Sequence, residues 1–128
     1  INKKKLFKMS LNNNIDIGAH GFNHIDLSNL NYNELKSEVF DSKKYIEDII
    51  GREVKYFSYP YGKININCER LFRELGFVAA FTSKIGTINK DSNKYMLNRT
   101  DILSYDNFSS FKQKINGSWD WINFFLKK

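Results

Sequence analysis

Three short apolar segments separated by helical patterns constrain the fold more than any other feature of this chain. They are Ile15–Ala19, Val54–Tyr59 and Phe77–Thr82. β-Branched and aromatic residues favour strands, and an apolar run such as the third segment is typical of a parallel strand covered on both faces. A helical crossover between strands favours parallel pairing. The sequence therefore predicts an α/β fold.

The strongest helical pattern ends at residue 50. Asn31 or Asn33 can cap its start, and Gly51 can end it as a C-terminal cap. Apolar residues recur with a helical period at Leu35, Val39, Ile46, Ile49 and Ile50. The charged residues of this segment lie between the apolar ones and are Glu34, Lys36, Glu38, Asp41, Lys43, Lys44, Glu47 and Asp48. We expect these charges to form a solvated face.

Weaker patterns predict further elements around this centre. A helix should end near Leu11, a second should run over about Asn67–Leu75, and a third should begin at residues 105–107 and close at Gly117. A short strand is expected within Tyr95–Ile102. We predict one domain over residues 1–118. An aromatic helix over residues 119–128 should dock on that domain or on a partner, because it would otherwise expose an apolar patch.

Composition limits the class of protein. The chain has 128 residues, 41% of them hydrophobic, which is enough for one globular domain with a core. The net charge of +6 favours anionic surroundings but does not choose among them. No helix-turn-helix, zinc-finger or base-stacking pattern accompanies that charge, so we expect no nucleic-acid partner. Cys68 is the only cysteine, which excludes an intramolecular disulfide. No stretch approaches the roughly 18 apolar residues of a membrane-spanning helix.

The only two histidines, His20 and His24, lie four positions apart just after the first predicted strand. A loop or a single helical turn can bring the second imidazole alongside the first. Two imidazoles on one side of a turn can share a divalent cation. The alternative is a pair of capping or half-buried histidines.

A second polar corner follows the next predicted strand. The residues Pro60-Tyr61-Gly62 break this strand at its carboxyl end. His20 likewise lies at the carboxyl end of the first strand. Because parallel strands end at the same edge of a sheet, we expect His20, Pro60 and Thr82 to lie at one end. Arg99 follows the short late strand.

The order and spacing of these blocks resemble one family over about residues 11–102. The segment Ile17-Gly18-Ala19-His20, with His24, a long amphipathic helix and Tyr59-Pro60-Tyr61-Gly62, is similar to the carboxyl-terminal part of a NodB-homology polysaccharide deacetylase of carbohydrate esterase family four. The resemblance implies an incomplete (β/α) barrel. It is closest to a branch that reads Tyr-Pro-Tyr-Gly and includes deacetylases of surface glycans.

The resemblance also implies roles for five residues. His20 and His24 match the two metal-binding histidines, for Zn²⁺ or alternatively Co²⁺ or Ni²⁺. Tyr61 matches the residue whose backbone N–H contributes to the oxyanion hole, and Pro60 holds that corner rigid; an ordinary aromatic turn is the alternative. Ser58 stands where other members have an arginine that orients the catalytic base. Arg99 is the candidate for that task, against the alternative of a surface ion pair.

Two parts of the family pattern are absent. The Asp-Asp motif lies upstream of the histidines, but none of the fourteen residues before Ile15 is acidic, and no third histidine exists to supply the general acid. We therefore expect part of a metal-dependent deacetylase of an N-acetylated surface or cell-wall glycan that is incomplete as a catalyst. The alternative is a non-catalytic remnant that binds glycan or protein.

Two further expectations follow for the whole protein. A bacterial cell envelope or extracellular location is favoured, with the cytoplasm as the alternative. Because the strand that should precede Ile15 is absent, the sheet has an open edge, which predicts self-association.

Overall fold

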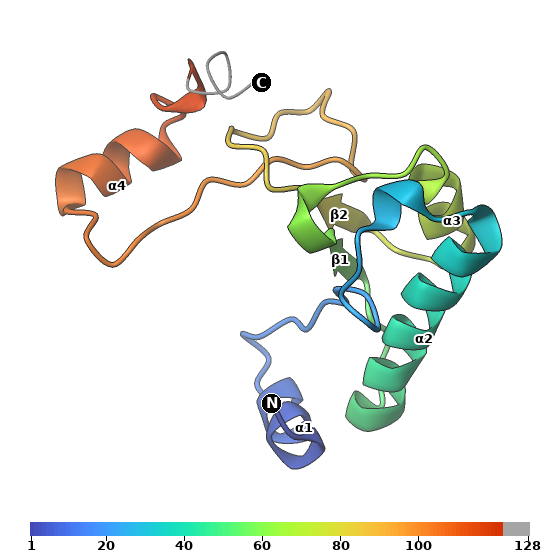
Figure 1. The fold of residues 1–128 in the computed structure, drawn as a ribbon. Coiled ribbons are helices and arrows are strands. Elements are labelled where there is room, and N and C mark those ends of the chain that lie inside the picture. The colour runs from blue at the N-terminus through green and yellow to red at the C-terminus, as the bar shows by residue number, and fades with distance from the viewer. Residues whose placement is uncertain (122–128) are drawn as a thin grey trace.

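A computed structural model describes residues 1–121 and shows an α/β arrangement (Figure 1). The helices are α1 (Lys3–Ser10), α2 (Tyr32–Ile50), α3 (Cys68–Glu74) and α4 (Phe108–Ile115). Two 3-10 turns, η1 (Leu27–Asn29) and η2 (Pro60–Gly62), and two strands, β1 (Tyr56–Ser58) and β2 (Ala79–Phe81), complete the described elements. The four helices predicted before residue 118 are all present.

The two strands are parallel neighbours, as predicted. Phe57 lies opposite Ala80, and the register extends one residue to each side. Ala19 joins the outer edge of β1, where its N–H donates to the Tyr56 carbonyl (2.8 Å) and its carbonyl accepts from the Ser58 N–H (2.9 Å). Leu97 joins β2 in the same parallel sense, opposite Phe81. The carboxyl ends of all four segments therefore lie at one end of the sheet.

The predicted strands at Ile15–Ala19 and Tyr95–Ile102 are reduced to single bridges, which corrects the sequence analysis. The carbonyl of Ile15 accepts from the guanidinium of Arg52 (2.9 Å) rather than from a strand neighbour. Beyond Leu97, the Arg99 N–H donates to the Lys84 carbonyl (2.8 Å), which lies outside β2. Beyond the two bridges, the Ile15 carbonyl and the Arg99 N–H therefore bond to partners outside the sheet.

Helix α2 begins and ends where its caps predict. The Asn31 side chain accepts from the Asn33 and Glu34 N–H groups, and the Glu34 carboxylate accepts in return from the Asn31 N–H. This capping box satisfies donors that the first helical turn leaves unpaired. At the other end Gly51 adopts the left-handed conformation, with φ of 69°.

The charged face of α2 is not wholly solvated, contrary to the expectation from its sequence. Glu38 and Lys43 are both buried. The Lys43 ammonium donates to the Glu47 carboxylate (2.6 Å) and to the Val54 carbonyl (2.7 Å), while the same Glu47 oxygen accepts from the Val54 N–H (2.7 Å). These bonds fasten the end of α2 to the segment that leads into β1.

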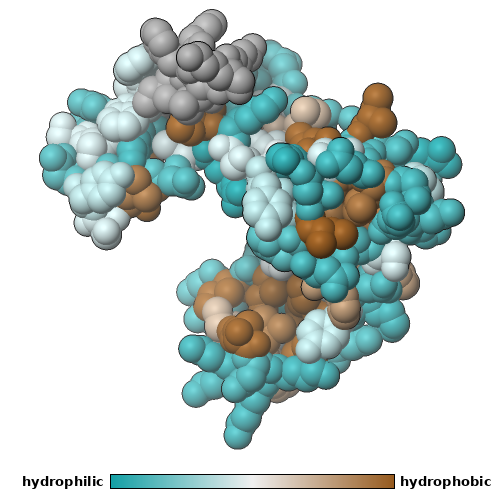
Figure 2. Space-filling model, viewed as in Figure 1, coloured by the Kyte–Doolittle hydropathy of each residue, from teal (hydrophilic) through white to brown (hydrophobic). Residues whose placement is uncertain are grey.

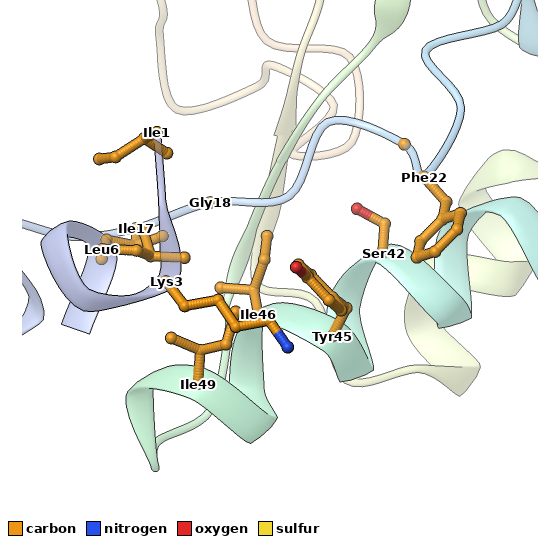
Figure 3. A pocket seen from close by; sticks show the side chains of 11 residues that line it. Ile1, Lys3, Leu6, Ile17, Gly18, Phe22, Ser42, Tyr45, Ile46 and Ile49 are labelled. Carbon is orange, nitrogen blue, oxygen red and sulfur yellow. The ribbon is translucent and has the colours of Figure 1, made fainter.

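An apolar cavity of about 540 Å³ lies between α1 and α2 (Figure 3). Leu6 and Ile17 line one side, and Tyr45, Ile46 and Ile49 of α2 line the other. Hydrophobic side chains gather at this part of the surface (Figure 2). The packing between these two helices is therefore looser than the core around β1.

Helix α4 projects from the body at the end of an extended segment (Figure 1). The Lys114 ammonium donates to the Asp106 carboxylate (2.7 Å) and to the Asp101 carbonyl (3.0 Å), and it lies over the ring of Trp119. The beginning of the aromatic tail thus contacts α4. Most of that tail, residues 122–128, lies outside the described residues, so the boundary at residue 118 and the docking of the tail stay predictions. Within residues 1–121 no helix is long and apolar enough to cross a membrane.

The core is an aromatic cluster between the sheet and the helices. The ring of Phe57 packs against those of Tyr59, Phe72 and Phe77 with centroids 4.9–5.7 Å apart. Leu35 and Val39 of α2 are fully buried in the same cluster. Because apolar burial drives folding, this cluster stabilises the strand that carries the Pro60 corner.

Replacing Phe57 by alanine should lower the free energy of unfolding by about 3–5 kcal/mol, because a buried ring is lost and a cavity remains. Phe108→Ala is the matched control; that ring is 80% exposed and should contribute less than about 0.5 kcal/mol. Urea unfolding followed by circular dichroism measures both. Equal losses would show that the core does not lie around β1.

Candidate active site

The structure brings His20, His24 and Tyr61 together at the carboxyl ends of the strands. The centroids of the two imidazoles lie 4.8 Å apart, and the His24 ring lies 4.9 Å from the ring of Tyr61. Both contacts are edge-to-face. His20 follows Ala19 and Pro60 follows Tyr59, so both lie at the same end of the sheet, as the sequence predicts.

The orientation of His20 is set by the main chain of β1. Its Nδ1 lies 2.6 Å from the Ser58 carbonyl. A carbonyl can only accept, so Nδ1 is the donor of this hydrogen bond, and in the neutral imidazole the lone pair is then on Nε2. An imidazole held in this way is prepared to ligate a cation through Nε2.

The loop between the two histidines rests on a buried carboxylate. The Asn23 N–H donates to Glu38 Oε1 (2.6 Å) and the Asn23 side-chain amide donates to Oε2 (2.9 Å). His24 follows with a left-handed backbone, φ of 56°. Sequence reasoning missed Glu38, although the spacing contained the signal: it lies three positions after Leu35 and next to Val39, on the apolar face of α2.

The two tyrosines that flank Pro60 have opposite environments. Tyr59 is buried, its hydroxyl donates to the Tyr95 carbonyl (2.8 Å), and burial raises the pKa of that hydroxyl. Tyr61 is 63% exposed and has a left-handed backbone, φ of 57°. Within residues 1–121 its N–H donates to no acceptor. The corner therefore anchors the ring of Tyr59 in the core and leaves the ring of Tyr61 exposed beside His24.

An ion pair connects the two loops. The Lys63 ammonium lies 2.5 Å from the Asp26 carboxylate, which also accepts from the Ser28 N–H and hydroxyl. The hydrogen bond from Lys63 lowers the pKa of Asp26 to about 2. A depressed carboxyl pKa contributes stability above the unfolded value, near pH 4, and that contribution is lost as the pH falls towards 2. The connection therefore persists through the neutral range.

Arg99 lies at the end of β2. Its Nε donates to the Thr82 carbonyl (2.7 Å). Within the described part of the chain it makes no ring contact with His20, His24 or Tyr61. Its role in orienting a base stays a prediction, and no surface ion pair of Arg99 occurs within residues 1–121.

The two imidazoles fit a divalent cation as part of a ligand set. Zn–N bonds are about 2.0–2.1 Å long, so rings 4.8 Å apart are close enough to share one ion. No group of three or more His, Cys, Asp or Glu side chains that could hold a metal occurs in residues 1–121. An open concavity of about 400 Å³ adjoins His20 and is lined by Gly18, Tyr56, Ser58 and Phe81 among others. There is thus room beside the histidines for further groups.

This fold and site define a member of the polysaccharide deacetylase family. The family model of polysaccharide deacetylases matches residues 1–80, and the chain belongs to that family. The protein YxkH of Bacillus subtilis strain 168 is 27% identical over 88 residues, which are 69% of this chain and 32% of YxkH. The resemblance seen in the sequence is therefore confirmed at the level of the family.

Solved structures confirm the fold. The deacetylase PplD of Streptococcus pyogenes, solved in complex with acetate, superimposes with a TM-score of 0.83 at 22% identity over 89% of this chain and 50% of PplD. The polysaccharide deacetylase BC0361 of Bacillus cereus gives a TM-score of 0.78 at 21% identity over 90% of this chain and 36% of its own. The chain therefore spans between a third and a half of these relatives, as an incomplete barrel.

Replacing Gly62 by alanine tests the packing of the corner. Its φ is 67°, and an added Cβ would lie 2.8 Å from the Ser83 backbone nitrogen. Left-handed strain of about 1–2 kcal/mol and overpacking of about 1–3 kcal/mol should together lower the free energy of unfolding by about 2–5 kcal/mol.

Gly51→Ala is the matched control, since Gly51 is also left-handed but has nothing within 4 Å of an added Cβ. It should cost only about 1–2 kcal/mol. Urea unfolding of both variants measures the difference. Equal costs would mean that the segment at Ser83 does not pack on the corner.

Proposed function

We propose that this chain forms part of a metal-dependent carbohydrate N-deacetylase, a hydrolase of the acetamide C–N bonds in an N-acetylated glycan. The observation that carries the proposal is the pair of imidazoles beside Tyr61, with His20 Nδ1 committed to the Ser58 carbonyl. Membership of the polysaccharide deacetylase family supports the class of reaction.

Four residues of this chain would take part in the reaction. His20 and His24 would hold Zn²⁺, or Co²⁺ or Ni²⁺ in its place. When bound, such a cation polarises a carbonyl and lowers the pKa of water. The Tyr61 N–H, which has no acceptor in residues 1–121, would donate to the oxyanion that forms on the acetyl oxygen. Pro60, buried beneath it, would keep that donor in place.

A second candidate is a deacetylase-like module that binds glycan or protein without catalysis. Residues 1–121 bring no third ligand to the histidines, and the sequence holds no third histidine to act as a general acid. This observation supports weak metal binding and low activity by the chain alone. It does not apply to a longer protein that contains additional ligands.

The setting of the reaction is also a proposal. We place the protein in the bacterial cell envelope or outside the cell, with the cytoplasm as the alternative, because surface and cell-wall glycans are the substrates that the Tyr59-Pro60-Tyr61-Gly62 branch suggests. The net charge of +6 suits an anionic envelope. Arg99 stays the candidate for orienting a base supplied from outside this chain.

Calorimetric titration with Co²⁺ should show binding to the unsubstituted chain and at least tenfold weaker binding, about 1.4 kcal/mol, to a His20→Ala, His24→Ala double variant. The physical reason is the loss of both imidazole ligands. A Phe108→Ala variant, which alters an exposed aromatic residue of α4 away from the histidines, should bind like the unsubstituted chain. Equal binding by all three proteins would refute the histidine site.

Acetate release from N-acetylglucosamine oligomers should stay near background with this chain. A missing base and a missing acid each remove about 10²–10⁴-fold in rate. Brisk turnover would show that the chain holds catalytic groups that we have not identified. Turnover only by a longer form of the protein would favour the enzyme over the binding module.

Self-association through the edge next to Ile17 is the final part of this proposal. Within residues 1–121 Ile17 and Gly18 form no backbone hydrogen bond, and both line the apolar cavity beside α1. Unpaired strand edges invite pairing with a second copy. Light scattering over micromolar concentrations should show a dimer, and Ile17→Pro, which cannot donate from its nitrogen, should shift it towards monomer. A monomer throughout would contradict this part.

A further inference from the structure

Glu38 lies on α2 beneath the loop that joins the two histidines. Its side chain is buried, with 5% exposure, and within the described part of the chain it forms no ion pair with Lys or Arg. A buried carboxylate without a cation is unfavourable unless donors surround it. Here both donors come from Asn23, at 2.6 and 2.9 Å.

Lys43, the other buried charged residue of α2 described above, has a structural role. Lys43 bonds to Glu47 and to the main chain of Val54, so it joins two parts of the body. Glu38 makes no such connection to the body: the hydrogen bonds that its carboxylate accepts within residues 1–121 all come from Asn23. The packing of the body therefore does not account for the carboxylate, whereas the order of the loop does.

The position of the two bonds matters because Asn23 directly precedes His24. His24 has a left-handed backbone, which is unfavourable for a residue with a Cβ and must be held by its surroundings. Glu38 also lies near the other end of the loop, since a Cβ added at Gly21 would lie 3.0 Å from its Oε1 and 3.4 Å from Pro60 Cγ. The carboxylate is thus close to the loop on both sides of Phe22.

We propose that Glu38 is a positioning residue for the histidine pair. Through Asn23 it holds His24 beside His20 and Tyr61 before any metal arrives, as the Ser58 carbonyl does for His20. Preorganised ligands bind more tightly, because the entropy of ordering the loop is lost on folding and not on binding. This inference rests on the metal site of the proposed function.

A reciprocal exchange of acid and amide tests it. Glu38→Gln places an amide donor against the Asn23 amide donor, and Asn23→Asp places two carboxylates together, so each single change should release the loop. The double variant restores both bonds: the new glutamine accepts from the main-chain N–H of residue 23 and donates to the new carboxylate. Asp48→Asn, an acid-to-amide change at an exposed position of the same helix, is the control.

Two measurements apply to all five proteins. Co²⁺ titration should give a Kd about 10- to 100-fold higher for each single variant, a value near that of the unsubstituted chain for the double variant, and no change for Asp48→Asn. Amide hydrogen exchange in the metal-free state should accelerate at residues 23 and 24 in the single variants and slow again in the double variant. Urea unfolding verifies that each protein is folded. Asn23 lies on an exposed loop, so the Asn23→Asp variant tests the positioning role of Glu38 even if Glu38→Gln does not fold.

The outcomes separate this inference from the proposed function. If His20 and His24 are needed for Co²⁺ binding but the single variants bind like the unsubstituted chain, or if the exchange fails to restore binding, Glu38 has no positioning role. If the unsubstituted chain binds no Co²⁺ through its histidines, the proposed metal site is wrong and the inference is overturned with it.

Discussion

The arrangement of this site depends on one parallel backbone pairing, between Ala19 and strand β1. Its two hydrogen bonds, to Tyr56 and from Ser58, bring the end of the first apolar segment level with the end of the second. The chain leaves the sheet at His20 on one side and at Pro60 on the other. A shift of this register by one residue would move His20 away from the Ser58 carbonyl and turn its side chain to the other face.

Around that pairing, polar contacts fix the positions of the loops that carry the site, because the backbone ladder is too short to do so. The Ser58 carbonyl orients His20, Glu38 holds the residue before His24, and Lys63 with Asp26 connects the two loops. Each contact joins segments that are at least fifteen residues apart in the sequence. The surface of the site is therefore built from loops whose geometry is decided by partners on α2 and β1.

The stability of this platform comes from one side of the sheet. The rings of Phe57, Tyr59, Phe72 and Phe77 form a packed cluster under α2 and α3. The other face, with Tyr56, Ser58 and Phe81, opens into a concavity next to His20. Solved deacetylases that match this fold are two to three times as long as the matched part, which agrees with an incomplete barrel. The same open face leaves the side of the sheet next to His20 accessible.

Much of this could be predicted from the sequence because the information is local. Apolar periodicity and caps identified α2, with Asn31 or Asn33 at its start and Gly51 at its end. Alternating strands and helices indicated parallel pairing, and the positions of His20 and Pro60 pointed to one end of the sheet. Only the tertiary structure decided that the ladders at Ala19 and Leu97 stop after one residue, with the Ile15 carbonyl bonded to Arg52 and the Arg99 N–H bonded to Lys84. It also decided that Glu38 is buried under the histidine loop while similar acids of α2 stay in solvent. Such choices depend on which segment packs over a helix face, and no property of a residue and its sequence neighbours determines that.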